Sequence, residues 1–369
     1  MFFRKRILSV SGSPGSIAWR KFKKNKTGLY SLVFLGFAVL IACLGYLVTP
    51  DATPYANDQY LELGLKRPGF SVMMLPVRDR VPHASQSFFR TMVTGEVMNL
   101  QNIPVRDFSY KNGSIFFIEY GAAAGDQALV RFLPAGTVER PVKKTFWLGS
   151  DRFGRDYLSQ LMIGTRVSLS VGLISVAISL LIGIFMGALA GYYRGWVDNF
   201  IMWIINVIWS IPTLLLVIAI TFALGKGFWQ VFIAVGLTIW VEVARVVRGQ
   251  ILGIREKEYV EAARAHGFSD YRIIVHHILP NVMAAVIVIS AANFASAILM
   301  EAGLSFLGLG VQPPVPSWGS MIKENYGYIV LDYAYLAVLP GLAIMLMVLA
   351  FMLIGNALRD ALDVRMSEA

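Results

Sequence analysis

Residues 167–190 read VSLSVGLISVAISLLIGIFMGALA, a run without a single charged side chain. A helix needs about 20 apolar residues to cross the hydrocarbon of a bilayer, which is roughly 30 Å thick. Further runs of this kind lie at 29–48, 201–223, 228–247, 282–300 and 335–355. The sequence therefore predicts six membrane-spanning helices, and the fourth and fifth of them have the least distinct ends.

The composition of the whole chain agrees with this prediction. Hydrophobic residues make up 56% of the 369 positions, and mean hydropathy is +0.60. Charged residues make up 15%, against about a quarter in soluble domains. The net charge is +10, but the basic residues lie beside the apolar runs, which argues against nucleic-acid binding. The single cysteine, Cys43, excludes a disulfide within the chain.

The distribution of Lys and Arg predicts the orientation, because short cytoplasmic loops carry an excess of these residues. With the N-terminus inside, the cytoplasmic segments hold 16 Lys and Arg, whereas 224–227 and 301–334 together hold 2. The segment 49–166 holds 14, but loops of that length cross the membrane largely regardless of charge. We expect both termini in the cytoplasm, with 1–28 a basic leader and 29–48 a retained signal-anchor span.

A hydrophilic insertion separates the first two spans. It contains Asn112-Gly113 between β-favouring runs, and an Asn-Gly pair is a strong hairpin signal because both residues tolerate φ > 0. Gln127 to Leu133 is typical of another strand. We expect 49–145 to form a small β-containing domain outside the membrane, and 146–369 to hold the other five spans.

The segment between the fourth and fifth spans contains EYVEAARAHG from Glu258 to Gly267. Residues 256–265 are good helix formers, and Gly267 suits the left-handed position that ends many helices. Ser269 is placed to cap a second helix, and Pro280 to begin the next span. The sequence predicts two short helices bent about a glycine at the membrane surface.

One face of the first short helix is shallow. Its members recur at i, i+3, i+4 and i+7: Tyr259, Ala262, Ala263 and His266. The small alanines would let a second protein approach closely, and Glu261 would offer it a carboxylate. The same residues also suit an ordinary interfacial helix pair that only joins two spans, so the residues alone leave both interpretations open.

This segment resembles the EAA loop of ABC importer permeases. The resemblance rests on Glu261-Ala262-Ala263, on Gly267 and on Ile278-Leu279-Pro280, which occur at fixed spacing in an inner loop of a multi-span chain. In that family the loop is the coupling helix that docks into a cleft on the ATPase subunit. The resemblance implies this role for the loop 255–280, carried by Tyr259, Glu261, Ala262, Ala263, Gly267, Ile278, Leu279 and Pro280.

Further motifs resemble the C-type permease subunit of dipeptide and oligopeptide importers. Residues 147–156 read WLGSDRFGRD and are similar to that group's LGTDxxGRD segment, with Ser150 in place of the usual threonine. Three other stretches resemble the group's leader and its last outer loop: WRKFKKNK at 19–26, LSFLGLG at 304–310 and PSWG at 316–319. The likeness covers about 11–48 and 145–365, and it leaves out most of 49–144.

The resemblance implies a fold and a set of partners. The fold would be an all-α polytopic membrane protein with six transmembrane helices of the type I ABC importer kind, plus the β-containing insertion. The function would be ATP-driven import of di- or oligopeptides, with nickel, glutathione or another peptide-like solute as the alternative. The partners would be a second homologous permease, two ATPase subunits and an extracytoplasmic substrate-binding protein, all at the bacterial inner membrane.

No catalytic or cofactor motif accompanies these features. Gly225-Lys226 lacks the upstream glycine of a phosphate-binding loop, so ATP and Mg are expected on the partner subunits. His276 and His277 are adjacent and project about 100° apart on a helix, so we expect no metal site.

Two other classes of membrane protein are disfavoured by the sequence. A secondary transporter would show inverted repeats, and a membrane-anchored enzyme would not need six spans.

Three polar residues inside the spans have open interpretations. Asn206 and Asn293 lie near mid-span, where they would line the pathway or bond between helices. Glu242 departs from the family pattern, and an intramembrane carboxylate is a candidate functional site. The competing interpretation is an ion pair with Arg245, three residues further along the helix.

Overall fold

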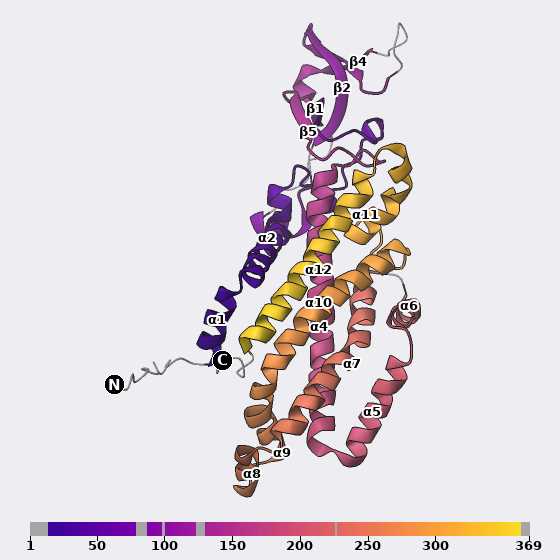
Figure 1. Ribbon diagram of the computed structural model, residues 1–369. Helices are drawn as coiled ribbons and strands as arrows, with labels where there is room; N and C mark the ends of the chain where they lie inside the picture. Colours follow the sequence, from indigo (N-terminus) through magenta and orange to yellow (C-terminus); the bar gives the residue numbers. More distant parts are fainter. Residues whose placement is uncertain (1–13, 79–86, 98–99, 123–129, 226, 363–369) are drawn as a thin grey trace, which may run out of the picture.

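A bundle of long helices carries a small β-sheet at one end, and a short helix projects from the other (Figure 1). We refer to these as the sheet end and the loop end. The computed structural model describes residues 14–78, 87–97, 100–122, 130–225 and 227–362.

Five helices of the described residues are long and apolar enough to cross a membrane. They are α2 (Lys26–Val48), α4 (Tyr157–Tyr193), α7 (Phe228–Ile254), α10 (Leu279–Phe306), which continues from the short α9 (Asp270–Arg272), and α12 (Tyr335–Leu362). The pair α4 and α7 packs closely because glycines on α4 recur every fourth residue. A Cβ atom at Gly187 would lie 2.5 Å from the Ala244 carbonyl oxygen, so only glycine permits this approach.

The run 201–223, predicted as one straight span, is broken. It forms α5 (Gly195–Trp209) and α6 (Thr213–Leu224), which are bent by 92° relative to each other. Pro212 explains the break, because proline lacks an N–H and disfavours helical geometry in the residue before it. If the bent pair counts as one span, the described chain has up to six.

The fifth span begins earlier than predicted, which corrects the expected pair of short helices. The helix runs without interruption from Asp270 to Phe306 and contains a π-helical turn at Ile273–Ile278. Within this turn the Leu279 N–H donates to the Ile274 carbonyl, one residue further back than in an α-helix. Only the first short helix, α8 (Glu258–Ala265), is separate, and the second is the first turn of the span.

The insertion forms a five-stranded antiparallel sheet in the order β4-β3-β2-β1-β5. Its strands are β1 (Phe70–Arg78), β2 (Leu100–Lys111), β3 (Ser114–Glu119), β4 (Val130–Pro134) and β5 (Val142–Phe146). The predicted hairpin is confirmed, with Asn112 at φ 49° and Gly113 at φ 72° between β2 and β3. Of the predicted strand from Gln127 to Leu133, residues 130–133 belong to β4 and 127–129 lie outside the described residues.

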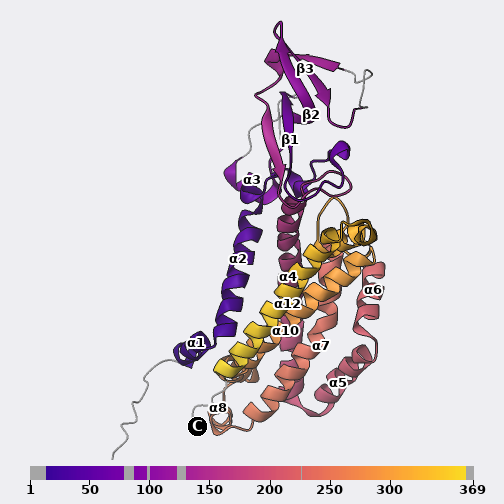
Figure 2. The same cartoon turned by 45° about the horizontal axis from the view of Figure 1, so that its top comes forward.

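Smaller helices lie at both ends of the bundle. At the sheet end are α3 (Phe88–Thr94) and α11 (Trp318–Asn325). Helix α1 (Pro14–Lys24) lies beside the end of α12, where Phe22 packs on Ala357 and Ala361. Figure 2 shows α1, α8 and this end of α12 on the side away from the sheet.

Candidate coupling surface and polar sites

A Schellman motif ends α8 and fixes the direction of the chain that follows it. The Gly267 N–H donates to the Arg264 carbonyl at 2.9 Å, and the Phe268 N–H donates to the Ala263 carbonyl at 3.2 Å. Gly267 has φ +77°, which confirms the predicted left-handed position. No atom lies within 4 Å of an added Cβ, so the backbone angle alone selects glycine here.

The inner face of α8 fastens it to the bundle. Val260 and Ala263 are buried in an apolar cluster with residues of α4, of α7 and of the fifth span, among them Tyr192, Ile251, Ile273 and Ile278. The hydroxyl of Tyr192, at the end of α4, donates to the Asp270 carboxylate at 2.6 Å. Burial of these aliphatic groups therefore holds α8 against three spans at once.

The outer face of α8 is exposed, and among its side chains the Tyr259 hydroxyl accepts a hydrogen bond from Asn281 Nδ2 at 3.3 Å. Tyr259 is 44% exposed, and Glu261 and Ala262 are also exposed. Ala263 corrects the predicted shallow face, because it points inward with Val260 rather than outward with Ala262. A surface of this kind suits a close contact with a second protein.

The other predicted residues of the 255–280 loop also divide into exposed and buried ones. Gly267 and Pro280 are exposed, Leu279 is half-buried and Ile278 is fully buried. Ser269 occupies the predicted N-cap position, but its side chain makes no capping hydrogen bond. The Phe268 ring stacks on His277 at 5.8 Å between ring centroids.

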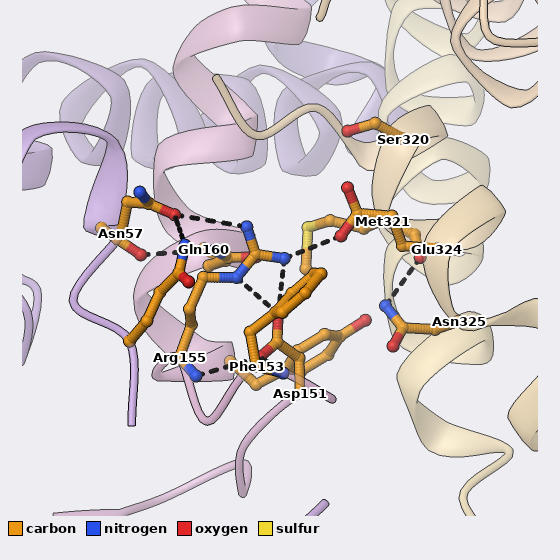
Figure 3. A network of polar contacts seen from close by, with 12 residues as sticks. Asn57, Asp151, Phe153, Arg155, Gln160, Ser320, Met321, Glu324 and Asn325 are labelled. Carbon is orange, nitrogen blue, oxygen red and sulfur yellow. Dashed lines mark hydrogen bonds and ion pairs between the residues drawn. The ribbon is translucent and has the colours of Figure 1, made fainter. Parts of the chain in front are cut away.

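A buried ion-pair network lies at the sheet end (Figure 3). The Arg155 Nε and Nη2 atoms lie 2.6 Å from Asp151 Oδ2, and Nη2 lies 2.7 Å from Glu324 Oε2 on α11. Its Nη1 lies 3.5 Å from Asn57 Oδ1, in the segment that follows α2. The side chains of Arg155 and Asp151 are 7% and 2% exposed. This network joins three parts of the chain: the segment after α2 that contains Asn57, the residues just before α4, and α11.

The backbone around this network is equally constrained. Gly154 has φ +73°, and an added Cβ would lie 1.7 Å from the Tyr60 carbonyl oxygen. Ser150, which replaces the usual threonine, is fully buried, donates to the Leu63 carbonyl and accepts from the Lys66 N–H. The WLGSDRFGRD segment is therefore a clasp that holds residues 60–66 of the insertion against the bundle.

Asp156 is the last residue of the WLGSDRFGRD segment and is buried directly before α4. Its Oδ1 accepts hydrogen bonds from the Ser159 N–H at 2.8 Å and from the Ser159 hydroxyl at 2.7 Å, which makes it an N-cap. Burial raises the pKa of the Asp156 carboxyl, and the two hydrogen bonds from Ser159 offset part of that shift.

The mid-span asparagines do not come together. Asn206 on α5 is exposed, and its Oδ1 accepts from Arg245 Nη2 on α7 at 3.1 Å. Asn293 on α10 is fully buried, and neither its amide nitrogen nor its oxygen has a hydrogen-bond partner in the described chain. The structure therefore gives Asn206 an interhelical bond and leaves Asn293 as a buried polar group among apolar helices.

The predicted ion pair between Glu242 and Arg245 is wrong. Arg245 instead places its guanidinium 3.5 Å from the centroid of the Trp209 ring, on α5, while bonding Asn206. Glu242 is exposed on the surface of α7 and has no salt bridge in the described chain. Trp209 and Asn206 both lie on α5, so Arg245 makes these contacts with a neighbouring helix rather than along its own.

Two family models match the sequence of this chain. Residues 179–368 match the family of the binding-protein-dependent transport system inner membrane component. Residues 13–68 match the N-terminal TM domain of oligopeptide transport permease C. A chain of a solved inward-facing MetNI methionine ABC transporter aligns at a TM-score of 0.47 and 19% identity, covering 56% of this chain and 97% of that chain.

Two relatives illustrate the similarity. The glutathione transport system permease protein of Pectobacterium atrosepticum is 44% identical over 217 residues, which cover 59% of this chain and 72% of the relative. The dipeptide transport system permease protein of Alkalihalophilus pseudofirmus is 42% identical over 220 residues, which cover 60% and 72%. Together with the family match over 179–368, these findings show that the chain belongs to the inner membrane components of binding-protein-dependent transport systems.

Proposed function

We propose that this chain forms half of the membrane pathway of an ATP-driven importer for di- or oligopeptides. The name of a dipeptide permease with 42% identity supports this substrate class. Glutathione is the second candidate, because a relative with 44% identity bears that name. A second permease would complete the pathway, two ATPase subunits would bind ATP and Mg, and an extracytoplasmic binding protein would deliver the substrate.

The exposed face of α8 carries this proposal, because it is a fixed surface at the loop end that the described part of the chain leaves open to a second protein. We propose that Tyr259, Glu261 and Ala262 contact an ATPase subunit, while Ala263, Ile278 and Leu279 hold α8 in place. The Schellman turn at Gly267 connects α8 directly to the continuous helix from Asp270 to Phe306. A helix of that length spans about 55 Å, so movement of α8 would reach the sheet end along a single element.

The orientation follows from the same assignment. We propose that the loop end and both termini are cytoplasmic, and that the sheet lies outside, where it meets the binding protein. The excess of Lys and Arg in the short segments at the loop end supports this orientation. Cysteine labelling in cells tests it, in a chain whose Cys43 is replaced by serine. An impermeant thiol reagent should modify Asn112→Cys and spare Ser269→Cys, and the reverse pattern would overturn the orientation.

The substrate class is tested with the assembled complex. The complex should be purified through a tag on this chain, reconstituted in ATP-loaded proteoliposomes and supplied with its binding protein. Uptake of labelled alanylalanine, competed by unlabelled dipeptides and weakly by glutathione, is the expected result. Uptake of glutathione with no uptake of dipeptide would select the second candidate, and a tag that retrieves no ATPase would contradict the transporter assignment.

A further inference from the structure

Glu242 is a carboxylate on the surface of a membrane span, and no cation among the described residues forms a salt bridge with it. It lies near the middle of α7, between Val241 and Val243, which are both buried in the bundle. Its own side chain is exposed. An ionisable group within a span is costly in lipid and normally faces a partner or a water-filled cavity.

The arginines closest to Glu242 along α7 are engaged elsewhere. Arg245 lies over the Trp209 ring and bonds Asn206. Arg248 forms a bidentate ion pair with Asp198 at the start of α5, at 2.5 and 2.7 Å. Both guanidinium groups therefore fasten α7 to α5. The negative charge of Glu242 remains available to a cation outside this chain.

The exposed surface of α7 changes character along the helix. In the half near the sheet end, the exposed side chains are large and apolar: Trp229, Ile233 and Leu237. In the half near the loop end, Glu242 and Gly249 are exposed and Arg245 is half-buried between them. These three residues recur at i, i+3 and i+7, so they share one face of the helix. The apolar residues near the sheet end have the chemistry of a lipid-facing surface. The face that holds Glu242 and Arg245 does not.

We infer that Glu242 lines the water-filled pathway between this chain and its companion permease, and that its carboxylate binds the protonated amino group of the substrate. This inference rests on the proposed import of peptides, whose free amino terminus is a cation at neutral pH. A carboxylate in a partly apolar pathway forms a charge-assisted hydrogen bond with an ammonium group, which is stronger than a bond between neutral groups. Glu242 is then a specificity-determining residue of the pathway.

Water access is tested first, because it does not depend on the identity of the substrate. In the Cys43-replaced chain, assembled in its complex, Glu242→Cys and Leu237→Cys are exposed to a charged methanethiosulfonate reagent. Reaction at position 242 and none at position 237 is the expected result. No reaction at position 242 would overturn the inference, as would equal reaction at both positions.

Substrate recognition is tested by transport kinetics in proteoliposomes. Glu242→Gln keeps the size of the side chain and removes its charge, so the KM for alanylalanine uptake should rise about tenfold. Asp360→Asn, a matched loss of charge at an exposed carboxylate near the end of α12, should leave the KM unchanged. An unchanged KM in Glu242→Gln would overturn the inference. Loss of the companion permease from the purified Glu242→Gln complex would also overturn it, because the carboxylate would then pair with a cation of that subunit.

A failure of the inference is distinct from a failure of the proposed function. If the unchanged complex takes up no dipeptide, the proposed substrate class is wrong, whatever Glu242 does. If the unchanged complex transports dipeptide and Glu242→Gln transports it with the same KM, only the role of Glu242 is wrong.

Discussion

The buried Arg155 network at the sheet end and the surface around α8 at the loop end differ in how their charged groups are paired. At the sheet end, Arg155 is 7% exposed and is held by Asp151 and Glu324. At the loop end, Glu261 is exposed, and the Arg194–Glu256 ion pair is 41% and 66% exposed. The Arg155 network therefore satisfies its charges within the chain, whereas the outer face of α8 leaves Glu261 for water or for another protein. This contrast distinguishes a clasp that maintains the fold from a surface that receives a partner.

The largest expected effect lies in the sheet-end network. Arg155→Ala would leave the buried Asp151 carboxylate without its cation, which typically costs about 3–5 kcal/mol. We expect a marked loss of thermal stability in detergent and a lower level of the chain in the membrane. Thermal unfolding of the purified protein measures the first effect, and quantitative blotting measures the second.

The matched control is Arg131→Ala on the sheet. Arg131 pairs with Glu119 at 2.6 Å, but the two side chains are 62% and 31% exposed. Exposed ion pairs contribute about 0–1 kcal/mol, so this variant should unfold almost as the unchanged chain does. Equal losses from Arg131→Ala and Arg155→Ala would remove the basis for the contrast between buried and exposed charges.

A smaller effect separates two glycines that share the same backbone conformation. Gly154 and Gly113 have φ +73° and +72°, but an added Cβ meets the Tyr60 carbonyl at Gly154 and open space at Gly113. Both alanine variants carry the left-handed strain of about 1–2 kcal/mol. Only Gly154→Ala should also displace the backbone at Tyr60, so its melting temperature should fall well below that of Gly113→Ala. Similar melting temperatures would mean that the WLGSDRFGRD segment accommodates a Cβ at residue 154 with no loss of stability.

The smallest effect on stability, but a large one on transport, is expected at the loop end. Gly267→Val would strain the Schellman turn by about 1–2 kcal/mol, and Asn tolerates the left-handed region, so Gly267→Asn is the control. Glu261→Lys would reverse a charge at the proposed ATPase contact. We expect Gly267→Val and Glu261→Lys to insert normally while uptake and substrate-stimulated ATP hydrolysis fall together. Normal transport by both variants would remove α8 as the site of coupling.

Local signals in the sequence predicted the features that depend on neighbouring residues. Asn112-Gly113 gave the hairpin, Gly267 gave the end of α8, and the apolar runs gave the spans, because each depends on the backbone or hydropathy of one stretch. The break in the third run also has a local signal in Pro212, because proline disfavours a helix that continues through it.

Contacts between distant segments could not be predicted in this way. Arg155 and Glu324 are 169 residues apart, and no periodicity in either segment relates them. Helical spacing suggested that Glu242 pairs with Arg245, but Trp209 and Asn206 of α5 contact the arginine instead. The orientation of Ala263 likewise depends on how α8 packs on the bundle.

Site-specific cross-linking from the two ends tests the central contrast most directly. Ala262→Cys on α8 and Asn112→Cys at the tip of the hairpin are compared in the Cys43-replaced chain, with the ATPase subunits present in the same membrane. The expected result is a cross-link of Ala262→Cys to an ATPase subunit and none from Asn112→Cys. A cross-link to the ATPase from Asn112→Cys, with none from Ala262→Cys, would contradict the assignment of the loop end as the coupling surface.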